Sequence, residues 1–157
     1  AIRAGELADS SLIARTLYKD RLITCASPGY LEQCGVPKNL SDLENGHSIV
    51  GYFSAATGEA WPLRFRTRGE DKQLGAFDIS ANDSAALISM LVHGMGIGQT
   101  HASVARRFIE SGELVPVLEE LTHRQFPVSI IYPPTRQLNA RVRIFIDWMV
   151  ARFSENN

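Results

Sequence analysis

Few residues of the kinds that do chemistry fall into a recognisable pattern in this sequence. The histidines are scattered along it: His47, His93, His101 and His123. Cys25 and Cys34 form neither a CxxC pair nor a Cys/His spacing typical of zinc, so we expect two reduced thiols, with a redox pair as the alternative. There is no GxSxG nucleophile elbow, no HExxH helix and no Walker loop. The sequence therefore predicts no enzyme, no bound metal and no cofactor.

The glycine run GMGIG, at 94–98, is the stretch that most suggests nucleotide chemistry. A dinucleotide fingerprint follows a strand, opens a helix and carries its third glycine in GxGxxG spacing. Here the run follows a predicted apolar helix, and Gln99 stands where the third glycine is required. The run therefore predicts a tight turn from a helix into a strand. Gln99 and Thr100, which follow the turn, are candidates to line a binding site.

Composition limits the class of protein. With 157 residues and 45% hydrophobic residues, the chain can bury one core or those of two small lobes. A formal net charge of -1 argues against a module that grips nucleic acid by itself. No stretch has the ~18 apolar residues of a membrane span, and no signal peptide opens the chain. Because residues 1–5 resemble the end of a strand and no Met precedes them, we expect a fragment whose upstream part is absent.

Strand and helix patterns alternate along the chain. Apolar runs bounded by turn signals predict strands at 21–26, 48–53, 61–66, 77–79, 114–118 and 128–132. Capping signals and helical periodicity predict helices after Ser27-Pro28, near 41–44, over 85–93, after 99–100 and at the end of the chain. This alternation favours a layered α/β fold with a largely parallel sheet. A β-hairpin from 61 to 79, turning at 69–72, is the expected antiparallel interruption.

Two helices have features that bear on a site or a core. Asn82, Asp83 and Ser84 precede the helix at 85–93 and offer three N-cap side chains; its N–H groups could also receive an anion, with Asn82 facing a cleft and Ser84 capping. The last helix carries one apolar face, formed by Leu138, Val142, Phe145, Ile146, Met149 and Phe153.

An ordered set of segments resembles the effector-binding domain of LysR-type transcriptional regulators. No single segment is specific, but together they run from Ala1 to Phe153 with family-like spacing. The segments are AIRAG (1–5), RLITCASPGYL (21–31), GVP (35–37), DL (42–43), Trp61, ND (82–83), GMGIG (94–98), SGELVPVL (111–118) and RIFIDW (143–148).

The resemblance implies a two-lobed, type 2 periplasmic-binding-protein-like α/β fold, with part of lobe one and the whole of lobe two. Residues 1–20 and 130–157 are expected in lobe one, and residues 21–129 in lobe two. It further implies a cytoplasmic regulator that pairs as a homodimer or homotetramer and does not bind membranes. DNA would be bound only through a winged helix-turn-helix that precedes this chain.

In that family a small effector lies between the lobes, which singles out eight residues here. The expected effector is an organic anion. The candidates at strand ends and helix starts are Arg3, Gly5, Tyr52, Phe53, Ser54, Asn82, Gln99 and Thr100. Four of them have a plain structural alternative: Phe53 as core, Ser54 as a loop start, Asn82 as a cap and Arg3 as a surface cation. The alternative function for the chain is a solute-binding protein of a transporter; a small-molecule enzyme ranks below both.

Overall fold

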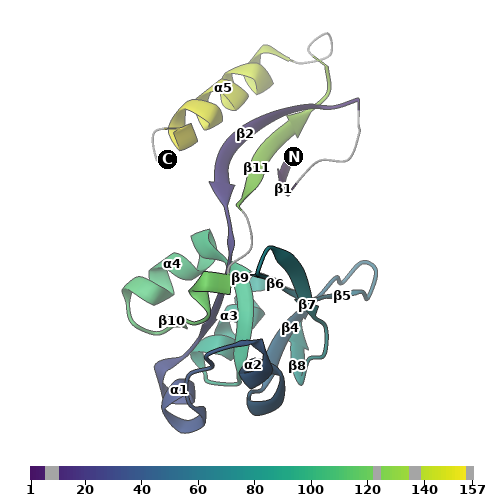
Figure 1. Ribbon diagram of the computed structural model, residues 1–157. Helices are drawn as coiled ribbons and strands as arrows, with labels where there is room; N and C mark the ends of the chain where they lie inside the picture. The colour runs from purple at the N-terminus through teal and green to yellow at the C-terminus, as the bar shows by residue number, and fades with distance from the viewer. Residues whose placement is uncertain (6–10, 122–124, 135–138, 155–157) are drawn as a thin grey trace. The chain divides into compact units, whose positions relative to one another are not determined.

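The computed structural model describes residues 1–5, 11–121, 125–134 and 139–154. They form two compact units (Figure 1). Unit 1 combines Ala1–Asp20 with Arg124–Asn157, and unit 2 is the continuous segment Arg21–His123. None of the described helices is long and apolar enough to span a membrane.

Unit 2 is built on a mixed sheet. Its strands are β3 (Leu22–Ala26), β4 (Ile49–Phe53), β5 (Ala60–Trp61), β8 (Ile79–Ala81), β9 (Ile97–His101) and β10 (Val115–Pro116). They lie in the order β10-β3-β9-β4-β5, with β8 also paired to β4. Only β4–β8 and β4–β9 are parallel among the described pairings. The prediction of a largely parallel sheet is therefore wrong, because β3 starts beside the end of β9, with Leu22 opposite His101, and so runs against it.

Four α-helices and a short 3-10 helix accompany this sheet. They are α1 (Pro28–Cys34), α2 (Leu40–Gly46), α3 (Ser84–Val92), α4 (Ala102–Glu110) and η1 (Glu119–Leu121). The predicted start at Ser27-Pro28 is confirmed, since the Ser27 hydroxyl accepts the Tyr30 N–H and Pro28 opens the helix. Gly94, in the turn after α3, has a positive φ of 73°, as expected for a glycine that ends a helix.

The predicted hairpin is present as a separate two-stranded sheet with a different turn and second strand. We call β6 (Leu63–Thr67) and β7 (Glu70–Leu74) the ribbon; they pair antiparallel around Arg68 and Gly69, both with positive φ. A hairpin is thus confirmed, but its turn comes earlier than 69–72 and its second strand is not 77–79. That segment instead supplies β8, because Phe77 lies directly over Gly51 and draws the following residues alongside β4.

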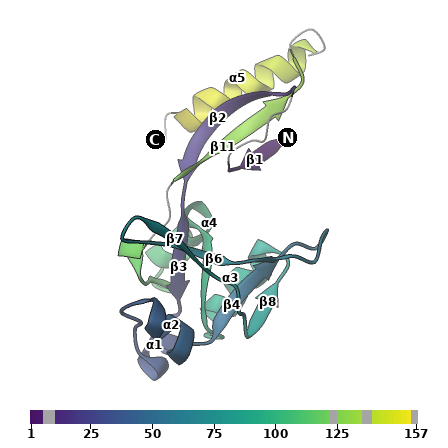
Figure 2. The ribbon, with the colours of Figure 1, turned by 45° about the vertical axis from the view of Figure 1, so that its right-hand side comes forward.

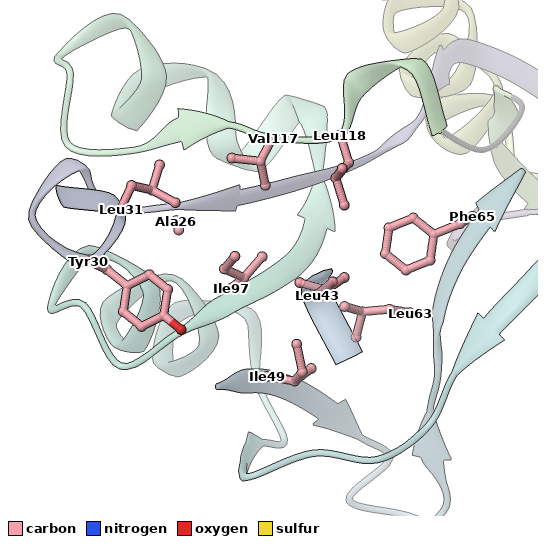
Figure 3. Packing of buried hydrophobic residues seen from close by; sticks show 10 residues of the cluster. All are labelled: Ala26, Tyr30, Leu31, Leu43, Ile49, Leu63, Phe65, Ile97, Val117 and Leu118. Carbon is pink, nitrogen blue, oxygen red and sulfur yellow. The ribbon is translucent and has the colours of Figure 1, made fainter. Parts of the chain in front are cut away.

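Apolar side chains of unit 2 are buried on both faces of the sheet, in two clusters. One cluster gathers residues from α1, α2, β4, β6 and β9 (Figure 3). Its buried members are Ala26, Tyr30, Leu31, Leu43, Ile49, Leu63, Phe65, Ile97, Val117 and Leu118. A second cluster, around α3, comprises Cys25, Val50, Ala81, Leu87, Ile88, Leu91 and Leu114. Successive residues of β3 and β4 belong to opposite clusters: Ala26 and Ile49 lie in the first, and Cys25 and Val50 in the second. This is expected because successive side chains of a strand point to opposite faces of the sheet.

Unit 1 is a small antiparallel sheet with one helix on it (Figure 2). Its elements are β1 (Ile2–Ala4), β2 (Ile13–Asp20), β11 (Phe126–Tyr132) and α5 (Ala140–Ser154), with strand order β1-β11-β2. The predicted return to this unit at residue 130 is too late. β11 pairs with β2 from its first residue, Phe126 opposite Asp20, so the division falls at 123/124.

Helix α5 buries a narrower face than its sequence predicts. Ile146 and Met149 are buried against Leu17 and Ile130, and Phe153 packs at their margin. Phe145 and Val142, both predicted on this face, are 52% and 43% exposed. Phe145 lies at the border of the apolar stripe, whereas Val142 lies near its middle but in the first turn of α5. Leu138 lies outside the described residues.

Candidate functional site

The parallel strands bring several predicted site residues to one edge of the sheet in unit 2. Val50 to Tyr52 of β4 pair in register with Ile79 to Ala81 of β8, and Val50 pairs with Gly98 of β9. The three strands therefore end together. We call this the carboxyl edge; it carries Ser54, Asn82 and Thr100. Ligands of α/β sheets collect outside such strand ends.

Tyr52 and Phe53 form the last two residues of β4, and both are half-buried. The Tyr52 ring packs against Trp61 of β5, with ring centroids 5.3 Å apart. Trp61 is 58% exposed and was not among the predicted site residues. Its alternation with Leu63 and Phe65 indicated a buried strand position, but β5 and β6 are separate strands, which places Trp61 on an open edge.

Ser54 helps to build the loop that follows β4. Its hydroxyl oxygen accepts the Thr57 N–H at 3.3 Å. Its main chain bonds to Glu59 and Gly58, Ser54 N–H to Glu59 O at 2.9 Å and Gly58 N–H to Ser54 O at 2.7 Å. The Ser54 O–H itself donates to no acceptor within the described part of the chain. A hydroxyl held in place by its loop, with its proton available, can donate to an anion.

The helix start beside Asn82 is capped by Asp83, and the expectation that Ser84 caps it is wrong. The Asp83 carboxylate accepts from Ala85 N–H and Ala86 N–H, each at 2.9 Å. A carboxylate at an N-terminus also suits the helix dipole. Because the first amides of α3 are already bonded to a negative group, an anion has no place there. Asn82 remains as an exposed amide at the carboxyl edge.

Gln99 and Thr100 point to opposite faces of β9, because successive side chains alternate along a strand. Thr100 is 4% exposed and lies on the same face as Gly98 and Tyr52. The Gln99 carboxamide lies on the other face, where it bonds to Arg64 and to Thr24. The structure thus groups Tyr52 with Thr100 and separates Gln99 from them.

Arg3 and Gly5 belong to unit 1, whereas the other six candidates belong to unit 2. Arg3 is an exposed residue of β1 opposite Ser129. Gly5 has a positive φ of 98° and donates its N–H to Pro127 O at 2.9 Å. This glycine ends the strand in a conformation that L side chains rarely adopt.

A hollow of about 440 Å³ in unit 2 contains none of the predicted residues. It is lined by Cys34, Gly35, Val36, Pro37, Ser41, Asp42, Asn45, Gly46 and His47. The Nδ1 atom of His47 is buried without a hydrogen-bond partner in the described part of the chain. The hollow opens between α1 and α2 and not at the carboxyl edge. No group of three or more metal-ligating side chains occurs among the described residues.

The family model of the LysR substrate binding domain matches residues 1–154 of this sequence. The chain belongs to this family. A transcriptional regulator of Neisseria meningitidis serogroup C, CrgA, is 32% identical over 161 residues, covering 99% of this chain and 52% of the relative. An HTH-type transcriptional repressor of Pseudomonas aeruginosa (strain UCBPP-PA14) is 34% identical, covering 99% of this chain and 49% of its own length.

Solved structures of the LysR family share the fold. The regulatory domain of CrgA superposes with a TM-score of 0.83 at 28% identity, covering 97% of this chain and 74% of that one. The regulatory domain of AphB from Vibrio vulnificus gives a TM-score of 0.80 at 25% identity, covering 96% and 73%. The predicted two-lobed, type 2 periplasmic-binding-protein-like fold is therefore confirmed. This LysR chain spans about half the length of the curated relatives that it matches.

Proposed function

We propose that this chain is the effector-sensing part of a cytoplasmic LysR-type regulator and that it binds a small organic anion at the carboxyl edge. The observation that carries the proposal is the register of β4, β8 and β9, which gathers Ser54, Asn82 and Thr100 at one place. Ser54 and Asn82 supply hydrogen-bond donors there, and Tyr52 with Phe53 supplies apolar contact. The similarity to transcriptional regulators favours sensing over transport or catalysis.

The proposed mechanism is a shift between two conformations of the domain. An effector moves such an equilibrium only by its differential affinity for the two states. The longer regulator would act as a homodimer or homotetramer and bind DNA through a part outside this chain. Arg3 and Gly5 remain a separate prediction for effector contact on unit 1.

The proposal is tested by thermal unfolding of the chain and of the full-length regulator against aromatic and aliphatic carboxylates, amino acids and sugars. A ligand at 100 times its dissociation constant adds about 2.7 kcal/mol to the free energy of unfolding. We expect a carboxylate to raise the melting temperature, and Ser54→Ala or Asn82→Ala to remove the shift. Thr57→Val is the matched control, because it removes a hydroxyl from the same loop away from the strand end. A ligand whose effect survives both substitutions would place its site elsewhere.

A further inference from the structure

The Gln99 side chain hydrogen-bonds to both the backbone N–H and the backbone C=O of one ribbon residue, Arg64. Its Oε1 accepts the Arg64 N–H at 2.8 Å, and its Nε2 donates to Arg64 O at 2.8 Å. Nε2 also donates to the hydroxyl of Thr24, which is 4% exposed, at 3.0 Å. One carboxamide therefore ties β3, β9 and β6 together.

The register of the ribbon explains why Arg64 needs an outside partner. Thr67 and Glu70 flank the two-residue turn and form a hydrogen-bonded pair, so the pair types alternate back from there. By this alternation Arg64 and Gln73 form a non-hydrogen-bonded pair, and the Arg64 N–H and C=O point away from β7. A primary carboxamide carries a donor and an acceptor side by side, as a peptide does. Gln99 therefore takes the place of a neighbouring strand.

Among the described residues, no strand pairing joins the ribbon to the six-stranded sheet. β6 and β7 pair only with each other, and the buried side chains of Leu63 and Phe65 supply the apolar attachment. Because Arg64 is exposed, protection of its amide from solvent exchange depends on the bond to Gln99 and not on burial.

We propose that Gln99 is a positioning residue: a latch that holds the ribbon on the sheet, and not a standing contact for the effector. The latch lies near the end of β9 at the carboxyl edge, on the opposite face of the strand from Thr100. Both Nε2 protons are already used, by the Arg64 carbonyl and the Thr24 hydroxyl, so an effector that accepts from this nitrogen must displace one of the two. An effector that displaces Arg64 turns the carboxamide away from it, so the ribbon is then the element that responds. This second step rests on the proposed function, whereas the latch itself does not.

The latch is tested without any effector by hydrogen exchange, read residue by residue, in Gln99→Met. Methionine keeps the length and loses all three hydrogen bonds, so we expect the Arg64 amide to exchange about tenfold faster or more. Amides of the β3–β9 ladder should not change. Thr24→Val is the matched control: it removes only the third bond and should leave Arg64 protected. Unchanged exchange at Arg64, or equal loosening of the whole sheet, would overturn the latch.

Two further arms separate the possible failures. Should Gln99→Met not fold, Gln99→Ser keeps a polar side chain that is too short to reach Arg64, and we again expect faster exchange at Arg64; a wild-type rate in that variant would reject the latch. With a stabilising carboxylate bound, Arg64 exchange in the wild type should rise. A ligand that stabilises the chain and leaves Arg64 protected would refute the coupling but not the latch. If no ligand stabilises the chain, the coupling falls with the proposed function, while Gln99→Met still decides the latch.

Discussion

Gly96 is a residue whose identity is required by a close approach between distant parts of the chain. Its φ is 154°, and a Cβ there would lie 2.3 Å from the carbonyl oxygen of Ser48. The glycine run predicted a tight turn at this point, and the turn is confirmed. The sequence offered no sign that the backbone of Ser48 would press on it, because that contact depends on how β9 pairs with β4.

We therefore expect Gly96→Ala to lower the free energy of unfolding by about 3 kcal/mol or more, from overpacking together with backbone strain. Gly112 is the matched control, since it has a φ of 77° but nothing within 4 Å of a Cβ. Gly112→Ala should cost only about 1–2 kcal/mol, the strain alone. Urea unfolding measures both variants. Equal losses would show that the turn at Gly96 relaxes away from Ser48.

The two cysteines differ sharply in their surroundings. Burial raises the pKa of the Cys25 thiol from its ordinary value of 9.0 to about 12, whereas Cys34 is exposed. The Cys25 thiol thus stays protonated in the folded chain at pH values where it ionises in the unfolded chain. The stability that this contributes is complete below pH 9 and is lost as the pH rises from 9 towards 12.

We expect the free energy of unfolding to fall by up to about 1.4 kcal/mol per pH unit above pH 9 from this group. Cys25→Ala should lack that part of the slope. Denaturant unfolding of both chains between about pH 8 and 10.5 gives the comparison. A thiol reagent near neutral pH should label Cys34 and spare Cys25 in the folded chain. Identical slopes, or early labelling of Cys25, would contradict the burial of this thiol.

At the scale of elements, helix α5 places a buried and an exposed large residue side by side. Met149 is 9% exposed and packs in the core of unit 1, while Trp148 is 56% exposed and lies beside Phe145. We expect Met149→Ala to cost about 2–5 kcal/mol of unfolding free energy. Trp148→Ala should change it by only about 0.5 kcal/mol.

Chemical unfolding monitored by far-UV circular dichroism compares these two variants directly. Each substitution also trades a helix residue for alanine, so intrinsic helix propensity favours both variants slightly. A loss for Trp148→Ala as large as that for Met149→Ala would mean that this face of α5 is covered in solution.

Most helices and strands were predictable because their signals are local. The start of α1 at Ser27 and Pro28, for example, depends on neighbouring residues alone. Strand partners were not predictable in the same way. Phe77 and Ile79 continue an alternating pattern and were assigned to the hairpin, yet β8 pairs with β4, since pairing is decided by tertiary packing. The choice of Asp83 among three possible caps likewise depends on where β8 ends.

At the scale of the whole molecule, the division into two units was predictable in outline but the sheet directions were not. The resemblance predicts that lobe two starts at residue 21; the compact unit 2 covers Arg21–His123. Parallel strands were expected from the alternation of strands and helices, a rule that assumes one connected crossover pattern. The candidate site also mixes features that local patterns predict with features that they do not. The predicted strand ends bring Ser54 and Asn82 to one edge of the sheet. The hydrogen bonds of Gln99, in contrast, depend on the ribbon, whose position local patterns did not predict.

Unit 2 carries its own core, which leads to a prediction about the isolated segment Arg21–His123. Both buried clusters of this unit lie entirely within the segment. Unit 1, in contrast, joins two stretches of chain around the small core of Leu17, Ile130, Ile146 and Met149. We expect the segment to fold alone and unfold in one cooperative transition, as single domains of this size usually do, while residues 124–157 alone stay unfolded.

Leu43, fully buried in unit 2, provides a matched test: Leu43→Ala should lower the free energy of unfolding by about 2–5 kcal/mol in the segment and equally in unit 2 of the whole chain. A segment that shows native helix content but a broad transition and exposed apolar surface would be a loosely packed state, and would mean that unit 2 depends on unit 1 for its packing.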